Sequence, residues 1–600
     1  MRPVLPLTLL LLACAAPLSR ADTKPALTAE DARQWEIPVE TGISNDGRWV
    51  ALGLRLVEGD GRLILKEVDT GRTFTIPRGS DPKFSDDGKR VAYRVLPEYD
   101  ELSRLREMGK KVPSALGVRS LVDGTERLFG ETESFEFLAG GRRLMVLGAD
   151  KTLRLIDFEG AQDVSLGGVA SAVADGSLER VAIAKEEGSS SVLVYDAKAN
   201  ALAELASGPF KASSLAWSKS SEALAFLVGV PVPDRAGLLN QLVTVTGLGG
   251  EAAKVRILDP TKEAGFPEGH RIYEGVVPSI SDDAGTVVFG ARKWDPAPST
   301  PDGTTVEVWN SKDKLTLPER NASRDTMGKR ALMYVWHPDE DKIIALNDSL
   351  YQEVSVLPGM GSAVVMDPRP YFDAANRNFM YWDVDVVSTR TGERTRAFTK
   401  ADNPPAASAT GSYVAAFDDG DWWVYHVEKR RRENLTKGLG VGFGDEILDF
   451  GASSEGPAAA PDWLAGDRGL LLYDRYDAWL FATDKGKVER VTSGRKSRRT
   501  FRLEPSLQAR DADAKTMTFR CFDESAKSAG FWRAESPGAG SALLSTPAAV
   551  RMSKRARDAD RVVYLRGSFE ESPSLYVADG SFENPKPVLA TNPQQSRFAW

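Results

Sequence analysis

The chain repeats a short pattern in which polar turn residues precede alternating hydrophobic positions. The clearest copies read ISNDGRWVALGL from Ile43, FSDDGKRVAYRV from Phe84 and ISDDAGTVVFGA from Ile280. In the Asp-Gly pair, Asp can bond its own backbone and Gly can adopt a positive φ, so the pair favours a tight turn. The alternation that follows has the period of a half-buried strand. Each copy therefore predicts a turn that opens a strand.

Weaker copies and a second element extend this pattern over the chain. The weaker copies are FLAGGRRLMVLG from Phe137, WSKSSEALAFLV from Trp217, WHPDEDKIIALN from Trp336 and WLAGDRGLLLYD from Trp463. Predicted hairpins follow, at LILKEVDTGRTFTI from Leu63, SVLVYDAKANALAEL from Ser191, WDVDVVSTRTGERTRAF from Trp382, WWVYHVEKRRRENLT from Trp422 and WLFATDKGKVERVT from Trp479. One charged stretch, DELSRLREMGKK from Asp100, predicts a helix.

Turn, strand, hairpin and strand, repeated with few helical stretches, predict an all-β chain folded as a β-propeller. Gly47 and Gly88 lie 41 residues apart and Gly88 and Gly141 lie 53 apart, which brackets the roughly 40 to 50 residues of a typical blade. We expect one propeller of seven or eight blades with insertions, because no Pro/Gly/Ser-rich linker divides the chain. Two smaller propellers in tandem are the alternative.

Composition places the chain among folded globular proteins. Hydrophobic residues make up 42% and charged residues 27%, which excludes disordered, collagen-like and polytopic membrane proteins. The net charge of −8 gives no basic surface for nucleic acid. The two basic clusters, 429–432 and 495–499, are interpreted as local turns. We therefore expect no nucleic-acid partner.

The first residues have the layout of an export signal. Arg2 precedes an apolar run from Leu7 to Ala13 and then small residues. We predict a signal peptide over residues 1–21, cleaved after Ala21, and hence a periplasmic or secreted bacterial protein. The alternative is a lipoprotein signal that ends before Cys14, although Leu12 is not favoured there and no Ser/Gly tether follows. Only a lipid on Cys14 would attach the chain to a membrane.

The side chains that catalysis needs are scarce. No G-x-S-x-G elbow occurs, and the nearest strings, GASSEG and GAGSAL, miss its spacing. His270, His337 and His426 are the three histidines; His337 falls in a repeat turn and His426 in a predicted strand. No H-E-x-x-H, Walker loop or dinucleotide motif is present. The sequence therefore predicts no catalytic, metal-binding or cofactor-binding residue, and no cofactor.

Cysteine, aspartate and tryptophan are interpreted as structural. Cys521 is the one cysteine beyond the signal, so no intramolecular disulfide is expected and the thiol is predicted to be buried and inert. Three acidic pairs fall at predicted turns, where Asp is a structural choice, namely Asp86-Asp87, Asp282-Asp283 and Asp418-Asp419. DADAK at Asp511 lacks the Gly and the distal Glu of an EF-type calcium loop. Trp382, Trp422 and Trp423 are predicted to be blade core.

The second half of the chain resembles a known family. The segments YWDVDVVSTRTGER, DDGDWWVYHVEKRRRENLTKGLG, GLLLYDRYDAWLFATDKGKVERVTSGR, CFDESAKSAGFWRA and SFEESPSLYVADGSFENPKPVLATNPQQSRFAW are similar, in order and spacing, to the N-terminal propeller of secreted bacterial peptidases of the prolyl oligopeptidase family. The first half, with ISNDGRWVA, agrees less specifically, since TolB-like propellers share that turn.

The resemblance implies an organisation and a role. It implies a propeller over residues 22–590 and, over 591–600, the start of a linker to an α/β-hydrolase domain that is absent from this chain. In this family the propeller caps the active site and admits peptides or small proteins by size, while the hydrolase domain carries the Ser-Asp-His triad. We therefore expect a truncated chain, inactive alone, whose partners are peptides and its own missing hydrolase domain. Glu570-Glu571 is interpreted as loop surface, because its context differs from the family's acidic peptide-binding segment.

A second hypothesis stays open beside this one. A stand-alone periplasmic TolB-like propeller would bind a protein or peptide partner, and a propeller fold alone does not distinguish the two.

Overall fold

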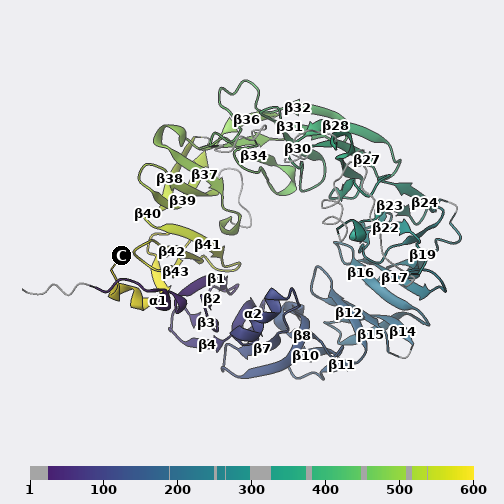
Figure 1. Cartoon of the computed structure of the whole chain (residues 1–600), viewed down its shortest axis with the longest axis horizontal. Helices are drawn as coiled ribbons and strands as arrows, with labels where there is room; N and C mark the ends of the chain where they lie inside the picture. Colours follow the sequence, from purple (N-terminus) through teal and green to yellow (C-terminus); the bar gives the residue numbers. More distant parts are fainter. Residues whose placement is uncertain are drawn as a thin grey trace, which may run out of the picture.

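The strands form a ring of blades (Figure 1). The structure is a computed structural model that describes residues 24–599 except 188, 249–252, 264, 298–325, 373–380, 448–455, 485, 509–515 and 537. The predicted signal over 1–21, including Cys14, lies outside the described residues, as do Asp511 and Trp600.

Each blade is an antiparallel meander whose strands follow one another in chain order. Blades 1 to 4 hold β1 (Glu36–Ile43), β2 (Trp49–Leu56), β3 (Arg62–Glu67), β4 (Thr73–Pro77); β5 (Gly79–Phe84), β6 (Arg90–Val95), β7 (Ala115–Ser120), β8 (Glu126–Leu138); β8 again, β9 (Arg143–Gly148), β10 (Leu153–Asp157), β11 (Val164–Leu166); and β12 (Val169–Ala174), β13 (Arg180–Lys185), β14 (Ser190–Asp196), β15 (Ala201–Gly208). Blades 5 to 8 hold β16 (Lys211–Trp217), β17 (Ala223–Pro231), β18 (Leu238–Thr246), β19 (Lys254–Leu258); β20 (His270–Ile272), β21 (Ser279–Ile280), β22 (Val287–Lys293), β23 (Leu332–His337), β24 (Lys342–Ala345); β25 (Glu353–Val356), β26 (Ser362–Asp367), β27 (Trp382–Ser388), β28 (Arg394–Ala401); and β29 (Ala406–Ala407), β30 (Tyr413–Asp418), β31 (Asp421–His426), β32 (Arg431–Asn434). Blades 9 to 11 hold β33 (Asp462–Trp463), β34 (Gly469–Tyr473), β35 (Ala478–Ala482), β36 (Lys487–Arg490); β37 (Arg499–Leu503), β38 (Thr518–Asp523), β39 (Ser528–Ser536), β40 (Ala539–Thr546); and β41 (Ala549–Arg555), β42 (Val562–Gly567), β43 (Ser574–Ala578), β44 (Lys586–Leu589). The helices that lie wholly within the described residues are α1 (Ala29–Arg33) and α2 (Tyr99–Glu107), with 3₁₀ turns η1 (Ala139–Gly141), η2 (Arg369–Tyr371), η3 (Ala465–Asp467), η4 (Arg495–Ser497), η5 (Pro505–Leu507) and η6 (Pro593–Arg597).

The all-β propeller predicted from the sequence is confirmed, but the expected seven or eight blades are too few. The described residues form eight four-stranded sheets, one five-stranded sheet and one seven-stranded sheet. The seven-stranded sheet is two blades, because β8 pairs with β7 over Glu126–Glu131 and with β9 over Thr132–Leu138. The described part of the chain thus makes eleven blades in a single ring rather than two propellers in tandem (Figure 1).

The undercount has a physical cause. In several blades, the turn between the first and second strands lacks the Asp-Gly pair on which the sequence pattern was based. In blade 7, the turn between β25 and β26 begins at Leu357, whose N–H donates to the carbonyl of Ser362 at 2.9 Å. In blade 8, the turn between β29 and β30 begins at Ser408, whose hydroxyl accepts a hydrogen bond from the N–H of Tyr413 at 3.1 Å. The same turn is therefore formed by different residues in different blades, so the sequence pattern did not identify all of its copies.

Where the Asp-Gly pair is present, it forms the predicted turn. The Ser44 hydroxyl donates to Asp46 Oδ1 at 2.5 Å and accepts from the N–H of Trp49 at 2.9 Å. Gly47 adopts φ +70°, which L side chains rarely adopt. Asp87 and Asp283 bond the equivalent serines, so these two aspartates are turn residues as predicted.

Each interface between neighbouring blades holds its own hydrophobic core. The described residues form eleven such clusters. One of them closes the ring, since Val50 and Leu52 of blade 1 pack with Val563 and Leu565 of blade 11. No strand is shared across this closure, because β1–β4 and β41–β44 form separate sheets. Side-chain packing therefore closes the ring.

Hydrogen bonds from one buried asparagine reinforce the closure. Asn592 Oδ1 accepts from the N–H of Glu36 at 2.8 Å, and Asn592 Nδ2 donates to the Glu36 carbonyl at 2.7 Å and to the Ser572 hydroxyl at 2.8 Å. Beyond it, the N–H of Ala599 donates to the carbonyl of Pro25 at 2.9 Å. The two ends of the described chain thus lie side by side.

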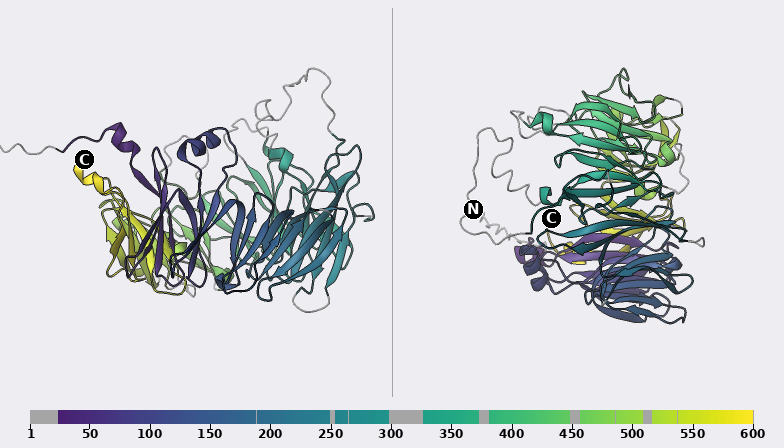
Figure 2. Two further views of the ribbon diagram at one scale, coloured as in Figure 1. Left: turned by 90° about the horizontal axis from the view of Figure 1, so that it is seen from below. Right: turned by 90° about the vertical axis from the view of Figure 1, so that its right-hand side faces the viewer.

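Two further predictions are confirmed. The helix expected from Asp100 is α2, and it projects from the same face of the ring as α1 and the C-terminal end (Figure 2). Trp382, Trp422 and Trp423 pack in or against the inter-blade cores. Within the described ranges, no helix is long and apolar enough to cross a bilayer.

Candidate binding site between blades 10 and 11

In the other blades, the second of the strands is largely buried on both faces. The second strand of blade 10, β38, departs from this arrangement. In blade 9, β34 is buried along its whole length. In blade 10, β38 buries Phe519 against blade 9, whereas Arg520 and Phe522 in the middle of the strand are exposed on the face toward blade 11. The core between blades 10 and 11 accordingly contains no β38 residue. This interface is only partly filled.

The exposed face of β38 carries an unfavourable pair of like charges. Arg520 is the direct cross-strand partner of Arg502 on β37, an arrangement that destabilises a sheet. Arg502 is held by carbonyls, since its guanidinium donates to the backbone oxygens of Phe501 at 2.8 Å and of Asp474 and Arg475 at 3.2 Å each. Burial, reinforced by the charge of Arg520, lowers the pKa of Arg502. The sheet thus holds two cations together without a carboxylate between them.

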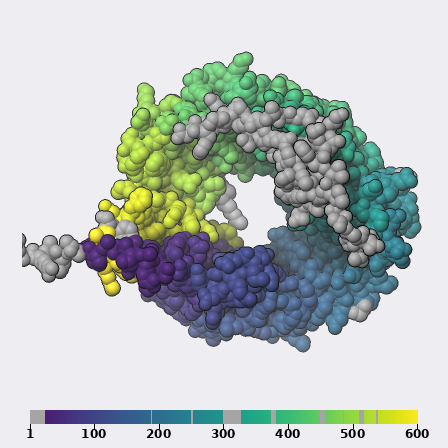
Figure 3. All heavy atoms as spheres, viewed as in Figure 1, coloured from purple at the N-terminus to yellow at the C-terminus, as the bar shows by residue number. Residues whose placement is uncertain are grey.

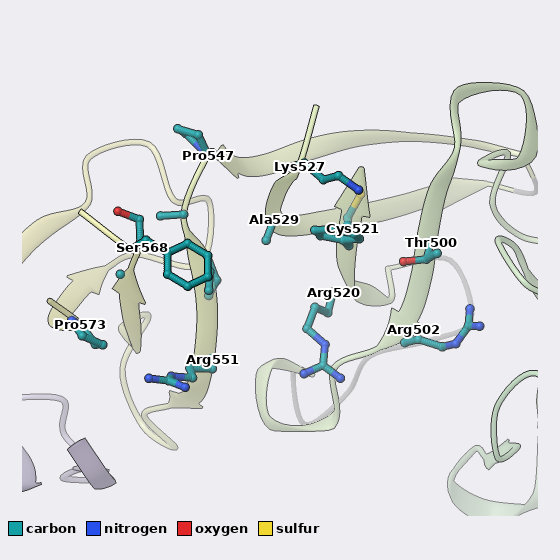
Figure 4. A pocket seen from close by; sticks show the side chains of 16 residues that line it. Thr500, Arg502, Arg520, Cys521, Lys527, Ala529, Pro547, Arg551, Ser568 and Pro573 are labelled. Atoms are coloured by element: carbon teal, nitrogen blue, oxygen red, sulfur yellow. The ribbon is translucent and has the colours of Figure 1, made fainter. Parts of the chain in front are cut away.

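A pocket of about 760 Å³ opens between these arginines and blade 11. Blade 11 contributes Arg551 from β41 and Ser568 and Phe569 from the loop after β42. In Figure 4, the guanidinium groups of Arg502, Arg520 and Arg551 lie toward the same end of the pocket, while Lys527 lies toward the other end. We call this cavity the arginine pocket. Its volume falls in the range of ligand sites, about 300 to 1,000 Å³.

The described residues that line the arginine pocket supply no counter-charge. None of its described lining residues is acidic. The nearest carboxylates along β38 are engaged elsewhere, because Asp523 pairs with Arg499 at 2.9 Å and Glu524 with Arg475 at 3.1 Å. Among the described residues, the side chains of Arg520 and Arg551 have no hydrogen bond or ion pair, nor has that of Lys527. Within the described residues, the pocket is therefore lined by positive charges and by no carboxylate, in a protein of net charge −8.

Aromatic side chains line the pocket beside these cations. Phe522 is 40% exposed and Phe569 is 95% exposed, the latter the largest exposure among the large hydrophobic side chains described. Exposed aromatic rings next to arginines are typical of sites that bind peptides or other proteins. The pocket thus offers apolar contact area as well as charge.

The groups in the pocket that could act as nucleophiles are not activated. Cys521 lies in the pocket wall, and burial raises the pKa of its thiol to about 11, so the thiol is protonated at neutral pH. Cys521 is free, as predicted, and half-buried rather than buried, while its inertness stays a prediction. The Ser568 hydroxyl accepts from the N–H groups of Glu570 and Glu571 at 3.1 Å each. The arrangement can bind an anion, but it lacks a base beside a nucleophile.

The three histidines lie far from this pocket in the sequence and have backbone or ring contacts. His337 ends β23, and both of its ring nitrogens are 2.9 Å from backbone carbonyls, those of Gly285 and Thr389. His426 packs edge-on against Tyr413, and burial lowers its pKa. His270 Nδ1 lies 2.8 Å from the carbonyl of Glu268. Each therefore has a structural contact of its own.

Sequence reasoning missed the arginine pocket. It assigned 495–499 to a turn, which η4 and the start of β37 bear out, but it did not single out Arg502, Arg520 or Arg551. The available signal was the string TFRCFD, which places an arginine in the middle of a second strand where other blades carry aliphatic residues. Glu570 and Glu571 do lie in an exposed loop, between β42 and β43, as predicted.

Comparisons with known proteins find only distant similarity. No protein-family model matches the chain, and no curated protein matches its sequence. Among solved structures, it is similar to the β-propeller domain of the Trilobed protease from Pyrococcus furiosus, with 12% identity, a TM-score of 0.25, and coverage of 62% of this chain and 100% of that one. It is also similar to the acylaminoacyl peptidase of Pyrococcus horikoshii (11%, TM-score 0.26, 86% and 52%) and to TolB from Acinetobacter baumannii (11%, TM-score 0.22, 54% and 76%).

Peptidase propellers are thus among the structural neighbours, as the resemblance in sequence predicted. The chain spans about half the length of the acylaminoacyl peptidase. At such identities and TM-scores, the likeness concerns the propeller alone, and any activity must be argued from the site.

Proposed function

We propose that this chain is a non-catalytic, substrate-gating propeller of a secreted serine peptidase of the prolyl oligopeptidase family. In this proposal, peptides enter or dock on the ring and are cleaved by a Ser-Asp-His triad that lies outside this sequence. The observation that carries the proposal is the arginine pocket, which combines uncompensated cations and exposed aromatic rings with an unactivated thiol.

Two further observations support this role. In this proposal, an extended chain enters through the opening at the centre of the ring, which Figure 3 shows. The resemblance of the segments from Tyr381 onward to peptidase propellers supports the family.

The direct test is the chemistry of the chain itself. The purified chain is expected to release no dye from a chromogenic peptide and to resist labelling by a fluorophosphonate, which reacts with activated serines. Labelling distinguishes activity of this chain from that of a contaminating peptidase, because the label is located on a gel band of known mass. A labelled chain, or turnover that follows the chain through purification, would overturn the non-catalytic role.

A second function is favoured by one observation. The arginine pocket is formed entirely by blades 10 and 11 of the ring, so it needs no second domain. Such a site suits a propeller that acts alone and binds a partner protein in the periplasm. Sequencing the gene past the codon for Trp600 separates the two functions. An open frame with a G-x-S-x-G elbow supports the peptidase, and an immediate stop codon supports the stand-alone binder.

A further inference from the structure

We infer that the arginine pocket is a binding site for the carboxylate groups of an acidic peptide segment that also carries an aromatic or aliphatic side chain. The inference rests on the peptide-binding role proposed above, and it specifies the chemistry of the peptide. The carboxylates are assigned to Arg520 and Arg551, and the apolar side chain to Phe522 and Phe569.

The clustered positive charges favour an anionic ligand. Arg502 and Arg520 are paired directly across two strands, and Arg551 faces them from the next blade. Such a cluster opposes folding of the sheet unless an anion relieves it. Places where a chain violates a local folding rule without a compensating contact are expected to be functional sites. A bound carboxylate would supply the missing counter-charge.

The arginine side chains favour a carboxylate among anions. Guanidinium groups recognise carboxylates with two parallel N–H···O bonds, which lysine cannot provide. Arg502 cannot turn to a ligand freely, because its donors are bonded to three backbone carbonyls and its guanidinium carbon lies 5.0 Å from the centre of the Tyr473 ring. Arg520 and Arg551 are exposed and have no such bonds among the described residues. These two side chains are therefore the ones available to grip an anion, and Arg502 adds a fixed charge behind them.

The aromatic rings favour a peptide over a free ion. A bare anion would leave Phe522 and Phe569 in water at the mouth of the site. A segment with an apolar residue beside its carboxylates covers these rings and gains from their burial. The required carboxylate can come from Asp or Glu side chains or from a peptide's C-terminus, since both present the same group.

Calorimetric titration of the full chain with three short peptides tests the inference. The first is an acetylated, amidated peptide with phenylalanine followed by two glutamates; the second replaces the glutamates by glutamines; the third keeps the glutamates and has a free C-terminus. We expect the glutamate peptides to bind and the glutamine peptide to bind at least about tenfold more weakly, because a hydrogen bond to a charged group is stronger than one to a neutral amide. Binding should also weaken as salt rises.

The double variant Arg520→Gln/Arg551→Gln should reduce this affinity by about tenfold or more. The matched control is Arg55→Gln, because Arg55 is also an exposed arginine on a second strand, β2, but lies outside the pocket. Thermal melting of each variant confirms that it folds. A gain in affinity for the free C-terminus assigns the α-carboxylate as a ligand, and equal binding of the two glutamate peptides assigns the side chains.

Three results would overturn the inference: equal binding of the glutamate and glutamine peptides, unchanged affinity in the folded double variant, or an equal loss in Arg55→Gln. These outcomes are separate from the failure of the proposed function. A chain that binds acidic peptides but is labelled by a fluorophosphonate keeps this inference and loses the non-catalytic role.

Discussion

Two interfaces of the same ring, between blades 8 and 9 and between blades 10 and 11, are built from equivalent strands with opposite contents. At the first, Ala415 and Phe417 of β30 pack against Leu470 and Leu472 of β34, and all four are buried. At the second, β38 presents Arg520 and Phe522 to a cavity of about 760 Å³. The interfaces between blades must be filled with side chains to stabilise the ring. An interface that is left open and charged therefore indicates a function other than stability.

The largest expected effect comes from emptying a filled interface. Leu472→Ala should lower the free energy of unfolding by about 2 to 5 kcal/mol, because it removes buried methyl groups and leaves a cavity. Phe522→Ala, at the open interface, should change it by less than about 1 kcal/mol, because that ring is already part-exposed. Urea unfolding followed by tryptophan fluorescence compares the two. Similar losses would remove the distinction between the interfaces.

The thiol in the pocket wall offers a probe of its environment. With a pKa near 11 instead of the ordinary 9, Cys521 should react with iodoacetamide about a hundredfold more slowly than a free thiol at pH 7, since each pKa unit changes the thiolate fraction about tenfold. The rate should keep rising up to about pH 11. Mass spectrometry on a Cys14→Ser background follows this reaction, and a rate that levels off near pH 9 would contradict the raised pKa.

The closure between blades 1 and 11 should depend on one side chain. Asn592→Ala removes four hydrogen bonds from a buried position, and we expect a loss of about 1 to 3 kcal/mol of stability at this interface. Hydrogen exchange should show faster exchange of the Glu36 amide. Ser596→Ala, in the exposed turn that follows, is the control and should leave that amide unchanged.

The smallest expected effect has the opposite sign. Arg520→Glu replaces a like-charge pair across β37 and β38 by an ion pair with Arg502. It should raise the free energy of unfolding by about 0.5 kcal/mol, a small value because position 520 is exposed and the Arg502 guanidinium is already bonded to backbone carbonyls. A gain in stability together with lost affinity for acidic peptides would show that the arginines of the pocket lower the stability of the sheet and are kept for binding. A clear loss of stability would argue that Arg520 is structural.

Local pattern predicted much of this architecture. Asp-Gly turns followed by alternation were enough for the strands around Gly47 and Gly88, and the helix α2 was found by its charge spacing. The number of blades was not predictable in the same way, because the turns at Leu357 and Ser408 are equivalent but contain no Asp-Gly pair. The pocket escaped because its arginines come from three strands, β37, β38 and β41, and only the pairing of β37 with β38 and the packing of blade 11 bring them together.

The way the ring closes has a consequence for how freely the chain can be rearranged. Each blade is a continuous segment, no strand of the described chain spans the joint between the first and last blades, and Ala26 lies beside Ala599. No blade is therefore an obligatory starting point. A circularly permuted gene that joins these ends through a short linker and opens between β15 and β16 should fold to the same ring, since stability in repeat architectures is a sum over neighbouring units.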